Sequence, residues 1–245
     1  MPPSALARTP EHPVDRFWRR LGGRPDFRGA RVLDVGCGNG GLTRDVVRAG
    51  AHDALGIDIQ ERLIARARRI SEEDGTPGLA TFEAIDVAEL GGGARFDAVV
   101  SLNAFEHIDE FTVRFSRIVD LLKPGGRIYV GFGPLYHSPF GGHRRMRMFL
   151  PWMHLLLPER AIIAWMRLWH GRDFVARTVR EMGLNQLTVF DFERAMLGHP
   201  ELKNCSWQVN HGDNWVSRAF RWFGDRGIAR RWVSHDIYAV FEKRR

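Results

Sequence analysis

The fold of this 245-residue chain is decided by the stretch Val32-Leu33-Asp34-Val35-Gly36-Cys37-Gly38-Asn39-Gly40-Gly41. A short apolar run carries an acid near its end and then breaks into alternating glycines. Such a run predicts a buried strand that leads through a tight turn into a helix. Because glycine lacks a Cβ, the backbone of this turn can approach a ligand closely and adopt positive φ. The stretch therefore predicts a site where a nucleoside-containing cofactor lies against bare backbone.

The glycines alone leave two kinds of cofactor open. Gly36, Gly38 and Gly41 also satisfy the G-x-G-x-x-G pattern of dinucleotide-binding folds, which is a weak signal by itself. Asp58 ends the next apolar run and lies 18 residues after Gly40. That spacing is close to the roughly 20 residues at which an acid meets the ribose hydroxyls in such sites. A carboxylate there can accept both hydroxyl protons, whichever nucleoside cofactor is bound.

The composition is that of a globular protein with a sizeable core. Hydrophobic residues make up 44% of the chain and charged residues 27%, which argues against wholesale disorder. The two cysteines, Cys37 and Cys205, are too few for a disulfide framework. No apolar signal-peptide region and no run of about 18 apolar residues is present. We therefore expect a cytoplasmic location.

The charge of the chain is basic, with a formal net value of +7 and an isoelectric point of about 10.2. One interpretation is attraction to nucleic acid, phospholipid or an acidic small molecule. The other is a set of arginines scattered over a solvated surface. Because the arginines are dispersed through most of the chain, the second interpretation is favoured here.

Strand-like and helix-like patterns alternate from residue 30 onward, which predicts an α/β, Rossmann-like, doubly wound and mostly parallel sheet. We expect residues 1–29 to form a leader with a short helix over 14–21, and residues 30–245 to form one domain. The expected strands cover 30–35, 54–59, 80–85, 96–102, 127–132, 205–210 and 236–242. The expected helices cover 42–48, 61–73, 110–122, 188–197 and a basic, tryptophan-bearing segment over 214–230, with a turn at Lys123–Gly126.

Residues 134–187 interrupt this rhythm after the fifth strand. Connections in α/β units typically have about 2–6 residues, so we expect a lid that takes part in acceptor binding. Three roles remain open for its aromatic and basic side chains: packing on the sheet, contact with a hydrophobic or anionic acceptor, and contact with a lipid surface. These side chains are Trp152, Trp165, Trp169, Arg144, Arg145, Arg147, Arg160 and Arg167.

Three later elements separate the two kinds of cofactor. Asp86 follows the third strand, Phe96–Ser101 forms the fourth, and Leu121–Ile128 (LLKPGGRI) leads into the fifth. This ordered set, over about residues 30–132, resembles the class I S-adenosylmethionine (SAM) dependent methyltransferases. A dinucleotide-dependent oxidoreductase does not explain the Leu-Lys-Pro-Gly-Gly element.

The resemblance implies a seven-stranded sheet with an antiparallel last strand and SAM as the cofactor. In that family the glycine turn holds the amino-acid end of SAM, the second-strand acid binds ribose and the third-strand acid binds adenine. The cofactor-binding residues implied here are Asp34, Gly36, Cys37, Gly38, Gly40, Asp58, Ile59, Asp86, Val87 and Asn103.

Candidate catalytic residues follow the fourth strand. His107 could take a proton from an acceptor hydroxyl, or it could only orient its loop. Some family members resemble this segment as Glu-x-x-Glu-His plus a later His and bind a divalent ion. Here Asn103 stands at the first position, while Glu106 and His107 match and His137 or His143 would complete the set. Because Asn103 removes a charge, a metal site is not favoured, although Glu106, His107 and His143 stay its candidate ligands. His143 is also a second catalytic candidate.

The resemblance, which includes ubiquinone-type enzymes, implies transfer of a methyl group from SAM to a small-molecule or lipid-like acceptor, most often at oxygen. The alternatives are an RNA methyltransferase that uses the basic surface and a noncatalytic SAM-fold binding protein. No recognised nucleic-acid-binding module accompanies the arginines, so a nucleic-acid partner is not expected. Peripheral membrane contact stays open.

Overall fold

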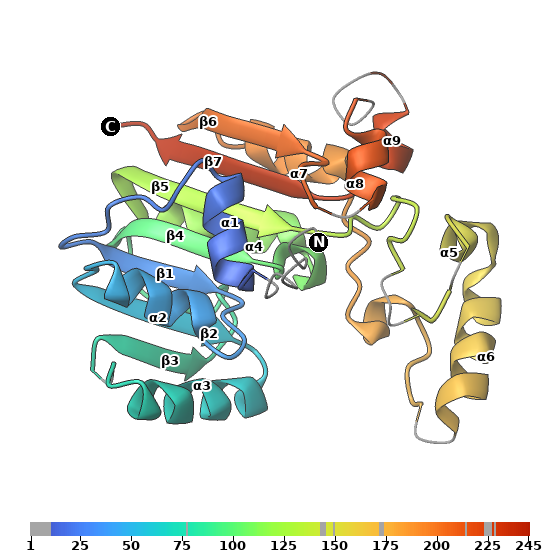
Figure 1. Ribbon diagram of the computed structural model, residues 1–245, viewed down its shortest axis with the longest axis horizontal. Helices are drawn as coiled ribbons and strands as arrows, with labels where there is room; N and C mark the ends of the chain where they lie inside the picture. The colour runs from blue at the N-terminus through green and yellow to red at the C-terminus, as the bar shows by residue number, and fades with distance from the viewer. Residues whose placement is uncertain are drawn as a thin grey trace, which may run out of the picture.

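The structure, a computed structural model, describes residues 11–76, 78–142, 146–148, 150–171, 174–213, 215–222, 227 and 229–245. Its centre is a seven-stranded sheet in the order β3-β2-β1-β4-β5-β7-β6 (Figure 1). The first five strands are parallel, whereas β7 runs antiparallel to both of its neighbours. The strands are β1 (Arg31–Val35), β2 (Asp53–Asp58), β3 (Ala80–Ala84), β4 (Phe96–Leu102), β5 (Leu122–Phe132), β6 (Leu202–Val209) and β7 (Ile237–Lys243).

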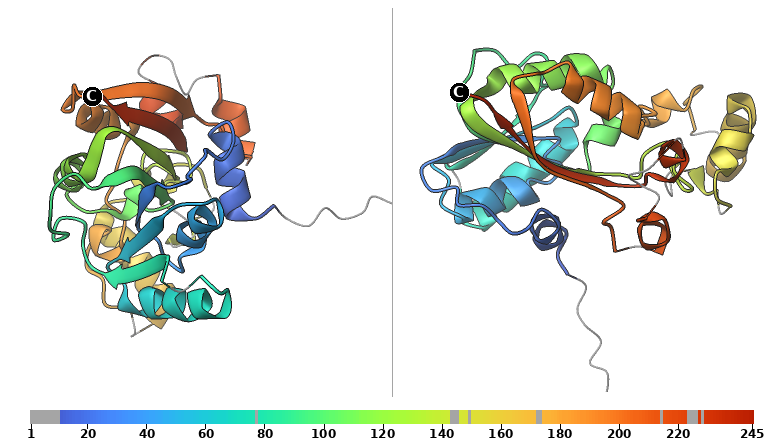
Figure 2. Two further views of the ribbon diagram at one scale, coloured as in Figure 1. Left: turned by 90° about the vertical axis from the view of Figure 1, so that its left-hand side faces the viewer. Right: turned by 90° about the horizontal axis from the view of Figure 1, so that it is seen from above.

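Helices cover both faces of the sheet, which confirms the doubly wound arrangement (Figure 2). On one face pack α1 (Pro13–Arg20), α2 (Gly41–Arg48) and α3 (Glu61–Glu73). On the other pack α4 (Phe111–Leu121) and α7 (Val189–Leu197). The remaining helices are α5 (Met153–Leu156), α6 (Glu159–His170), α8 (Trp215–Phe220) and α9 (Arg230–Val233), with 3₁₀ turns η1 (Phe105–His107) and η4 (Arg180–Met182).

Phe192 of α7 contacts aromatic side chains from two strands on the second face. Its side chain is fully buried, and its ring centroid lies 5.0 Å from that of Phe132 in β5 and 5.5 Å from that of Trp207 in β6. A capping box starts the helix, because Thr188 accepts from the amide of Asp191 and the Asp191 carboxylate accepts from the amide of Thr188. This packing fixes the end of the segment that precedes α7.

Helix α1 belongs to the domain core. Phe17 and Trp18 are buried against the sheet, and the Trp18 indole donates to the Asp45 carboxylate of α2 at 2.7 Å. The expected helix over residues 14–21 is therefore present and packed. The first ten residues of the expected leader lie outside the described residues.

Two sequence-based expectations need correction. The helix α4 ends at Leu121, but Lys123–Gly126 do not form a separate turn: they lie inside β5, where the pairing with β4 shifts register between Phe96 and Ala98. The basic segment over 214–230 is not one helix, because α8 ends at Phe220. Gly227 adopts φ +65°, a conformation that interrupts a right-handed helix. Asn214 lies outside the described residues.

Residues 134–187 are here called the insertion, and those of them that the structure describes lie beyond the carboxyl ends of the parallel strands (Figure 1). The insertion has a small apolar core of its own, formed by Met146, Ile162, Met166, Val179 and Leu184. It therefore projects from the edge of the sheet where α/β proteins bind their ligands.

Across the described ranges, no helix is long and apolar enough to cross a bilayer.

Candidate functional site

A cleft of about 490 Å³ opens at the carboxyl edge of the sheet. In the sheet, β2 and β3 lie on one side of β1, whereas β4 and β5 lie on its other side. The cleft lies at β1, where the order of the strands reverses. Such a switch point is the usual ligand site of a doubly wound sheet. The walls follow four successive strands and include Val35–Gly38, Ile57–Gln60, Leu63, Ile85–Val87, Leu102–Ala104, His107–Asp109, Arg114 and Gly183.

The glycine turn forms the floor of this cleft. The amides of Gly36 and Cys37 both donate to the carbonyl oxygen of Ile57, at 2.8 and 2.9 Å. Gly36 has φ +71°, and a Cβ there would lie 2.2 Å from the Cβ of Ala104. Gly38 has φ +54°, and no heavy atom lies within 4 Å of the position of its Cβ. The turn is therefore tight against Ala104 and presents bare backbone to the open cleft.

Asp58 lies beside this turn with its carboxylate at the wall of the cleft. One oxygen accepts from the Gly38 amide at 3.1 Å and the other from the Gln60 amide at 2.9 Å. Each carboxylate oxygen can accept a second hydrogen bond, so two ribose hydroxyls can still be bound. The neighbouring Ile59 is 72% exposed, and it gives the wall an apolar surface suited to a nucleoside.

Asp86 and Val87 line the cleft at the end of β3. The Asp86 carboxylate pairs with the Arg114 guanidinium at 2.7 Å and also accepts from the Ala88 amide at 2.9 Å. Burial opposes ionisation, but these hydrogen bonds outweigh it and hold the pKa of Asp86 below its usual range. Contact of Asp86 with adenine remains a prediction. Sequence reasoning missed Arg114, although a basic residue three positions into α4 was a visible signal.

Asp34 lies behind the turn rather than in the cleft wall. Its side chain is 1% exposed, and its carboxyl accepts from the Thr43 hydroxyl at 2.6 Å. Burial raises the pKa of Asp34 to about 7, although the Thr43 hydrogen bond lowers it. Gly40 also lies behind the wall, as the left-handed N-cap of α2. Both residues are therefore placed to shape the turn.

His107 lines the cleft from η1, on the side of β4. Its Nδ1 lies 2.6 Å from the carbonyl oxygen of Gly183 in the insertion. Because a carbonyl can only accept, Nδ1 carries the proton. When the ring is uncharged, Nε2 is therefore the atom that can take a proton.

The insertion is anchored to η1 by Asn185, a residue that the sequence patterns did not indicate. Its side-chain amide donates to the carbonyl oxygens of Phe105 at 2.6 Å and Ile108 at 2.8 Å. Its own amide oxygen accepts from the Leu187 amide at 2.9 Å. These bonds hold the last residues of the insertion against the loop that follows β4.

The residues considered as metal ligands have different hydrogen-bond partners or lie in different parts of the structure. Glu106 is buried, and the Gly133 amide donates to its carboxylate at 3.4 Å. The His137 Nδ1 accepts from Arg231 at 2.9 Å, on the side of α9. Asn103 lines the cleft with φ +55°. His143 lies outside the described residues, as do Arg144 and Arg145. Within the described part of the chain, no three His, Cys, Asp or Glu side chains are grouped to hold a metal.

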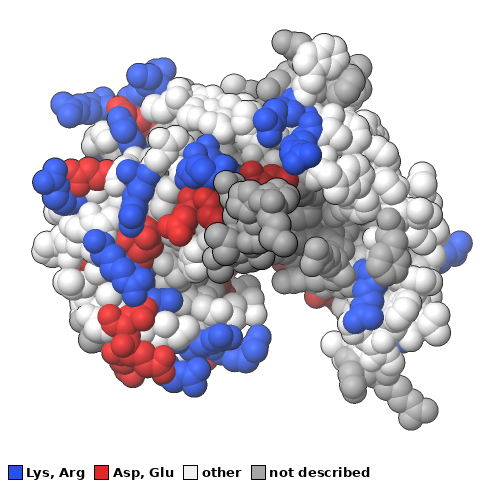
Figure 3. Space-filling model, viewed as in Figure 1, with Lys and Arg blue, Asp and Glu red and all other residues white. Residues whose placement is uncertain are grey.

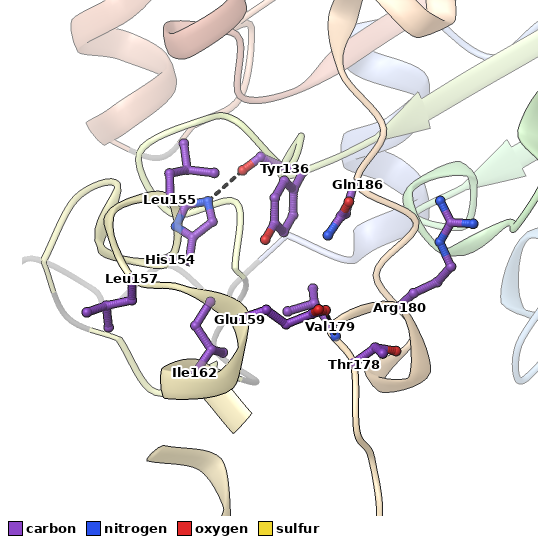
Figure 4. Close-up of a pocket in the computed structure, with 10 residues that line it drawn as sticks. All are labelled: Tyr136, His154, Leu155, Leu157, Glu159, Ile162, Thr178, Val179, Arg180 and Gln186. Atoms are coloured by element: carbon purple, nitrogen blue, oxygen red, sulfur yellow. Dashed lines mark hydrogen bonds between the residues drawn. The ribbon is translucent and has the colours of Figure 1, made fainter. Parts of the chain in front are cut away.

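A second cavity of about 490 Å³ lies within the insertion (Figure 4). Tyr136 and Gln186 line one side, and α6 contributes Glu159 and Ile162 to the other. The His154 Nε2 donates to the Tyr136 carbonyl at 2.6 Å, and burial lowers the pKa of His154 although this hydrogen bond raises it. The segment 178–186 contributes residues to this cavity, and its Gly183 lines the first cleft. The two spaces are therefore neighbours.

Residues 32–126 match the family described as a methyltransferase domain. Among curated proteins, the chain is similar to the ubiquinone biosynthesis O-methyltransferase of Xylella fastidiosa (strain M23), with 38% identity over 107 residues. That alignment covers 44% of this chain and 43% of the relative, so the chain spans less than half the length of that protein.

Two solved structures extend the likeness to the whole sheet. A putative S-adenosylmethionine dependent methyltransferase from Listeria monocytogenes has a TM-score of 0.61 at 17% identity, covering 94% of this chain and 98% of its own. The [4+2]-cyclase SpnF has a TM-score of 0.61 at 17% identity, covering 94% of this chain and 80% of its own. At this identity the likeness establishes the fold, and a fold alone does not specify a reaction.

Replacing Asp58 tests the cofactor site. Asp58→Asn keeps an acceptor for the Gly38 amide but cannot accept both ribose hydroxyls as a carboxylate does. Hydrogen bonds to a charged group contribute about 1.5–3 kcal/mol, so SAM affinity should fall about 10- to 100-fold. Equilibrium dialysis with labelled SAM measures this change. Asp120→Asn, an exposed carboxylate on α4, is the matched control. Unchanged affinity in Asp58→Asn would contradict the assignment.

The buried Asp34 carboxyl should make stability depend on pH. Its pKa of about 7 in the folded chain exceeds the value of about 4 in an unfolded chain. Between these values the folded state binds the extra proton, so the free energy of unfolding falls as pH rises, by on the order of 4 kcal/mol.

Asp34→Asn cannot titrate. Its free energy of unfolding, relative to that of the wild type, should therefore rise by about 4 kcal/mol between about pH 4 and about pH 8. Urea unfolding at a series of pH values measures the difference, and any constant effect of the amide cancels. A difference that does not vary with pH would show that Asp34 remains ionised.

Proposed function

We propose that this chain, which carries a class I SAM-dependent methyltransferase domain, transfers a methyl group to an oxygen atom of a small-molecule or lipid-like acceptor. Three observations support the cofactor part: the bare backbone of Gly38, the Asp58 carboxylate beside it and the apolar wall at Ile59. These groups fit the amino-acid end, the ribose and the base of SAM in that order along the cleft.

When bound, SAM supplies a methyl group activated by its sulfonium charge. The residues of the chain must then hold an acceptor in line with that group, because positioning accounts for much of the rate of such transfers. The second cavity is where we place the acceptor, since the segment 178–186 separates it from the cleft. Its lining combines apolar side chains with Tyr136 and Gln186, as expected for a partly apolar molecule with polar groups.

His107 carries the proposed catalytic step. A hydroxyl acceptor must lose its proton as the new bond forms, and Nε2 of His107 can take it because Nδ1 holds its proton on the Gly183 carbonyl. The same hydrogen bond fixes the plane of the imidazole ring. This arrangement is the single observation that most favours oxygen as the methylated atom. His143 remains a sequence-based candidate outside the described residues.

The similarity to ubiquinone biosynthesis O-methyltransferases supports a small-molecule acceptor. Both cysteines are free thiols, which supports the cytoplasmic location that we propose. The alternative function under test is SAM binding without methyl transfer, because a fold alone does not specify a reaction.

Incubation with methyl-labelled SAM and separated lipid, RNA and metabolite extracts tests the proposed function. We expect label in the lipid or metabolite fraction, in a product that withstands mild alkali, as a methyl ether does and a methyl ester does not. Label in RNA would favour the nucleic-acid alternative. Retained SAM binding with no labelled product in any extract would contradict methyl transfer.

Replacing His107 tests the proposed base. Loss of a positioned proton acceptor typically lowers the rate about 100- to 10,000-fold, so His107→Gln should lower kcat by this factor in the extract that is labelled by the wild type. SAM affinity should not change. His52→Gln, an exposed histidine at the start of β2, is the matched control. If His107→Gln retained full kcat, the histidine would only orient its loop.

A further inference from the structure

One end of the molecule exposes a set of large apolar side chains. They lie on the insertion, on α8 and the turn that follows it, and on α9, and we call this surface the apolar end. Leu156 is 80% exposed and Trp222 is 66% exposed. Isolated exposed side chains are ordinary, but a contiguous group marks an interaction site. The members are Leu150, Leu156, Leu168, Trp169, Val175, Trp215, Trp222 and Trp232.

Three contacts join the insertion to the carboxyl-terminal helices within this end. The indole nitrogen of Trp152 donates to the carbonyl oxygen of Trp232 at 2.9 Å. The ring of Trp152 also lies 6.1 Å from that of Phe220, and the ring of Phe140 lies 5.8 Å from that of Trp215. The start of α5 is therefore seated against α8 and α9. All these elements lie at the end toward which the parallel strands point (Figure 1).

The positive charge of the chain is concentrated in the same two segments. Residues 134–182 contain eight arginines and three acidic residues, and residues 215–233 contain five arginines and one acidic residue. The excess of arginines over acidic residues is five in the first segment and four in the second, and together these excesses are larger than the net charge of +7 of the whole chain. Elsewhere arginines are balanced by acids, as the paired colours at the opposite end of Figure 3 show. The scattered-surface interpretation of the charge therefore does not describe this end.

We propose that the apolar end docks on the surface of an anionic phospholipid bilayer. Tryptophan prefers the interface between headgroups and acyl chains, and arginine adds attraction to anionic headgroups. Exposed arginines such as Arg160, Arg167 and Arg218 flank the apolar side chains, so their guanidinium groups can reach the headgroups while the apolar groups enter the bilayer.

Aliphatic side chains favour this partner over RNA. Bases stack on aromatic rings, but Leu156, Leu168 and Val175 offer no stacking surface and are exposed with the tryptophans. Burying them in the interfacial region of a bilayer removes apolar area from water. The insertion also reaches the cofactor cleft through Gly183, so a lipid-like acceptor could pass from the bilayer to the site. That last step rests on the proposed function, whereas bilayer binding does not.

Co-sedimentation of the full chain with lipid vesicles tests the proposal. We expect at least about tenfold tighter binding to vesicles of phosphatidylcholine and phosphatidylglycerol in equal parts than to phosphatidylcholine alone, and weaker binding in high salt. Failure to bind the mixed vesicles would overturn the proposal. So would tighter binding to polyuridylate than to those vesicles under the same conditions.

Two sets of variants locate the surface. The triple variant Leu168→Ser, Trp215→Ser and Trp222→Ser should bind the mixed vesicles at least about tenfold more weakly. The matched control Val113→Ser with Leu197→Ser, which alters exposed apolar residues on α4 and α7, should bind as the wild type does. Equal binding by triple variant and wild type would overturn the proposal.

A second variant combines Arg160→Gln, Arg167→Gln and Arg218→Gln and keeps all the apolar side chains. It keeps the proposal testable if the first triple variant fails to fold. This variant should lose most of its preference for anionic vesicles, and retention of the full preference would overturn the proposal. SAM binding by each variant shows that the sheet is intact. Vesicle binding is measured without SAM, so its failure would leave methyl transfer to extracted lipids unaffected.

Discussion

The close approach of two loops, the glycine turn after β1 and the loop after β4, determines the shape of the cleft at the switch point of the sheet. Gly36 passes so near Ala104 that a Cβ would lie 2.2 Å from the Ala104 side chain. The same turn is held to β2 by two amide hydrogen bonds to the Ile57 carbonyl. This contact brings the ends of β1, β2 and β4 together and leaves the Gly38 backbone facing the cleft. The cofactor site, the placement of His107 and the anchor of the insertion all depend on it.

Sequence patterns predicted the sheet and much of the cleft because both are local in origin. An apolar run, a glycine turn and an acid at a fixed spacing are short-range features, and the parallel order follows from alternating strands and helices. The side of β1 on which Asp34 lies could not be predicted, because a parallel strand is buried on both faces and shows no alternation. Arg114 and Asn185 were missed because their partners, Asp86 and the carbonyls of η1, are distant in sequence.

The insertion was recognisable by its length, but its surface was not. Leu168 and Trp169 are exposed, whereas Ile162 and Met166 of the same helix are buried, and the sequence alone assigns neither group to solvent. The charge was misleading for a related reason. Arginines occur along the whole chain, but the insertion and the carboxyl-terminal helices hold few acidic residues, so positive charge is left in excess there. These two features together give the molecule one polar, ion-paired end and one apolar, basic end beside its cleft.

The central claim is that the cleft at the switch point is built for SAM and not for a dinucleotide. The Asp58 carboxylate would suit the ribose of either cofactor, so a comparison of their binding is decisive. Isothermal titration of the wild-type chain with SAM and, separately, with NADH measures this preference. We expect saturable heat with SAM and none with NADH. Saturable NADH binding without SAM binding would contradict the assignment of the cleft to SAM.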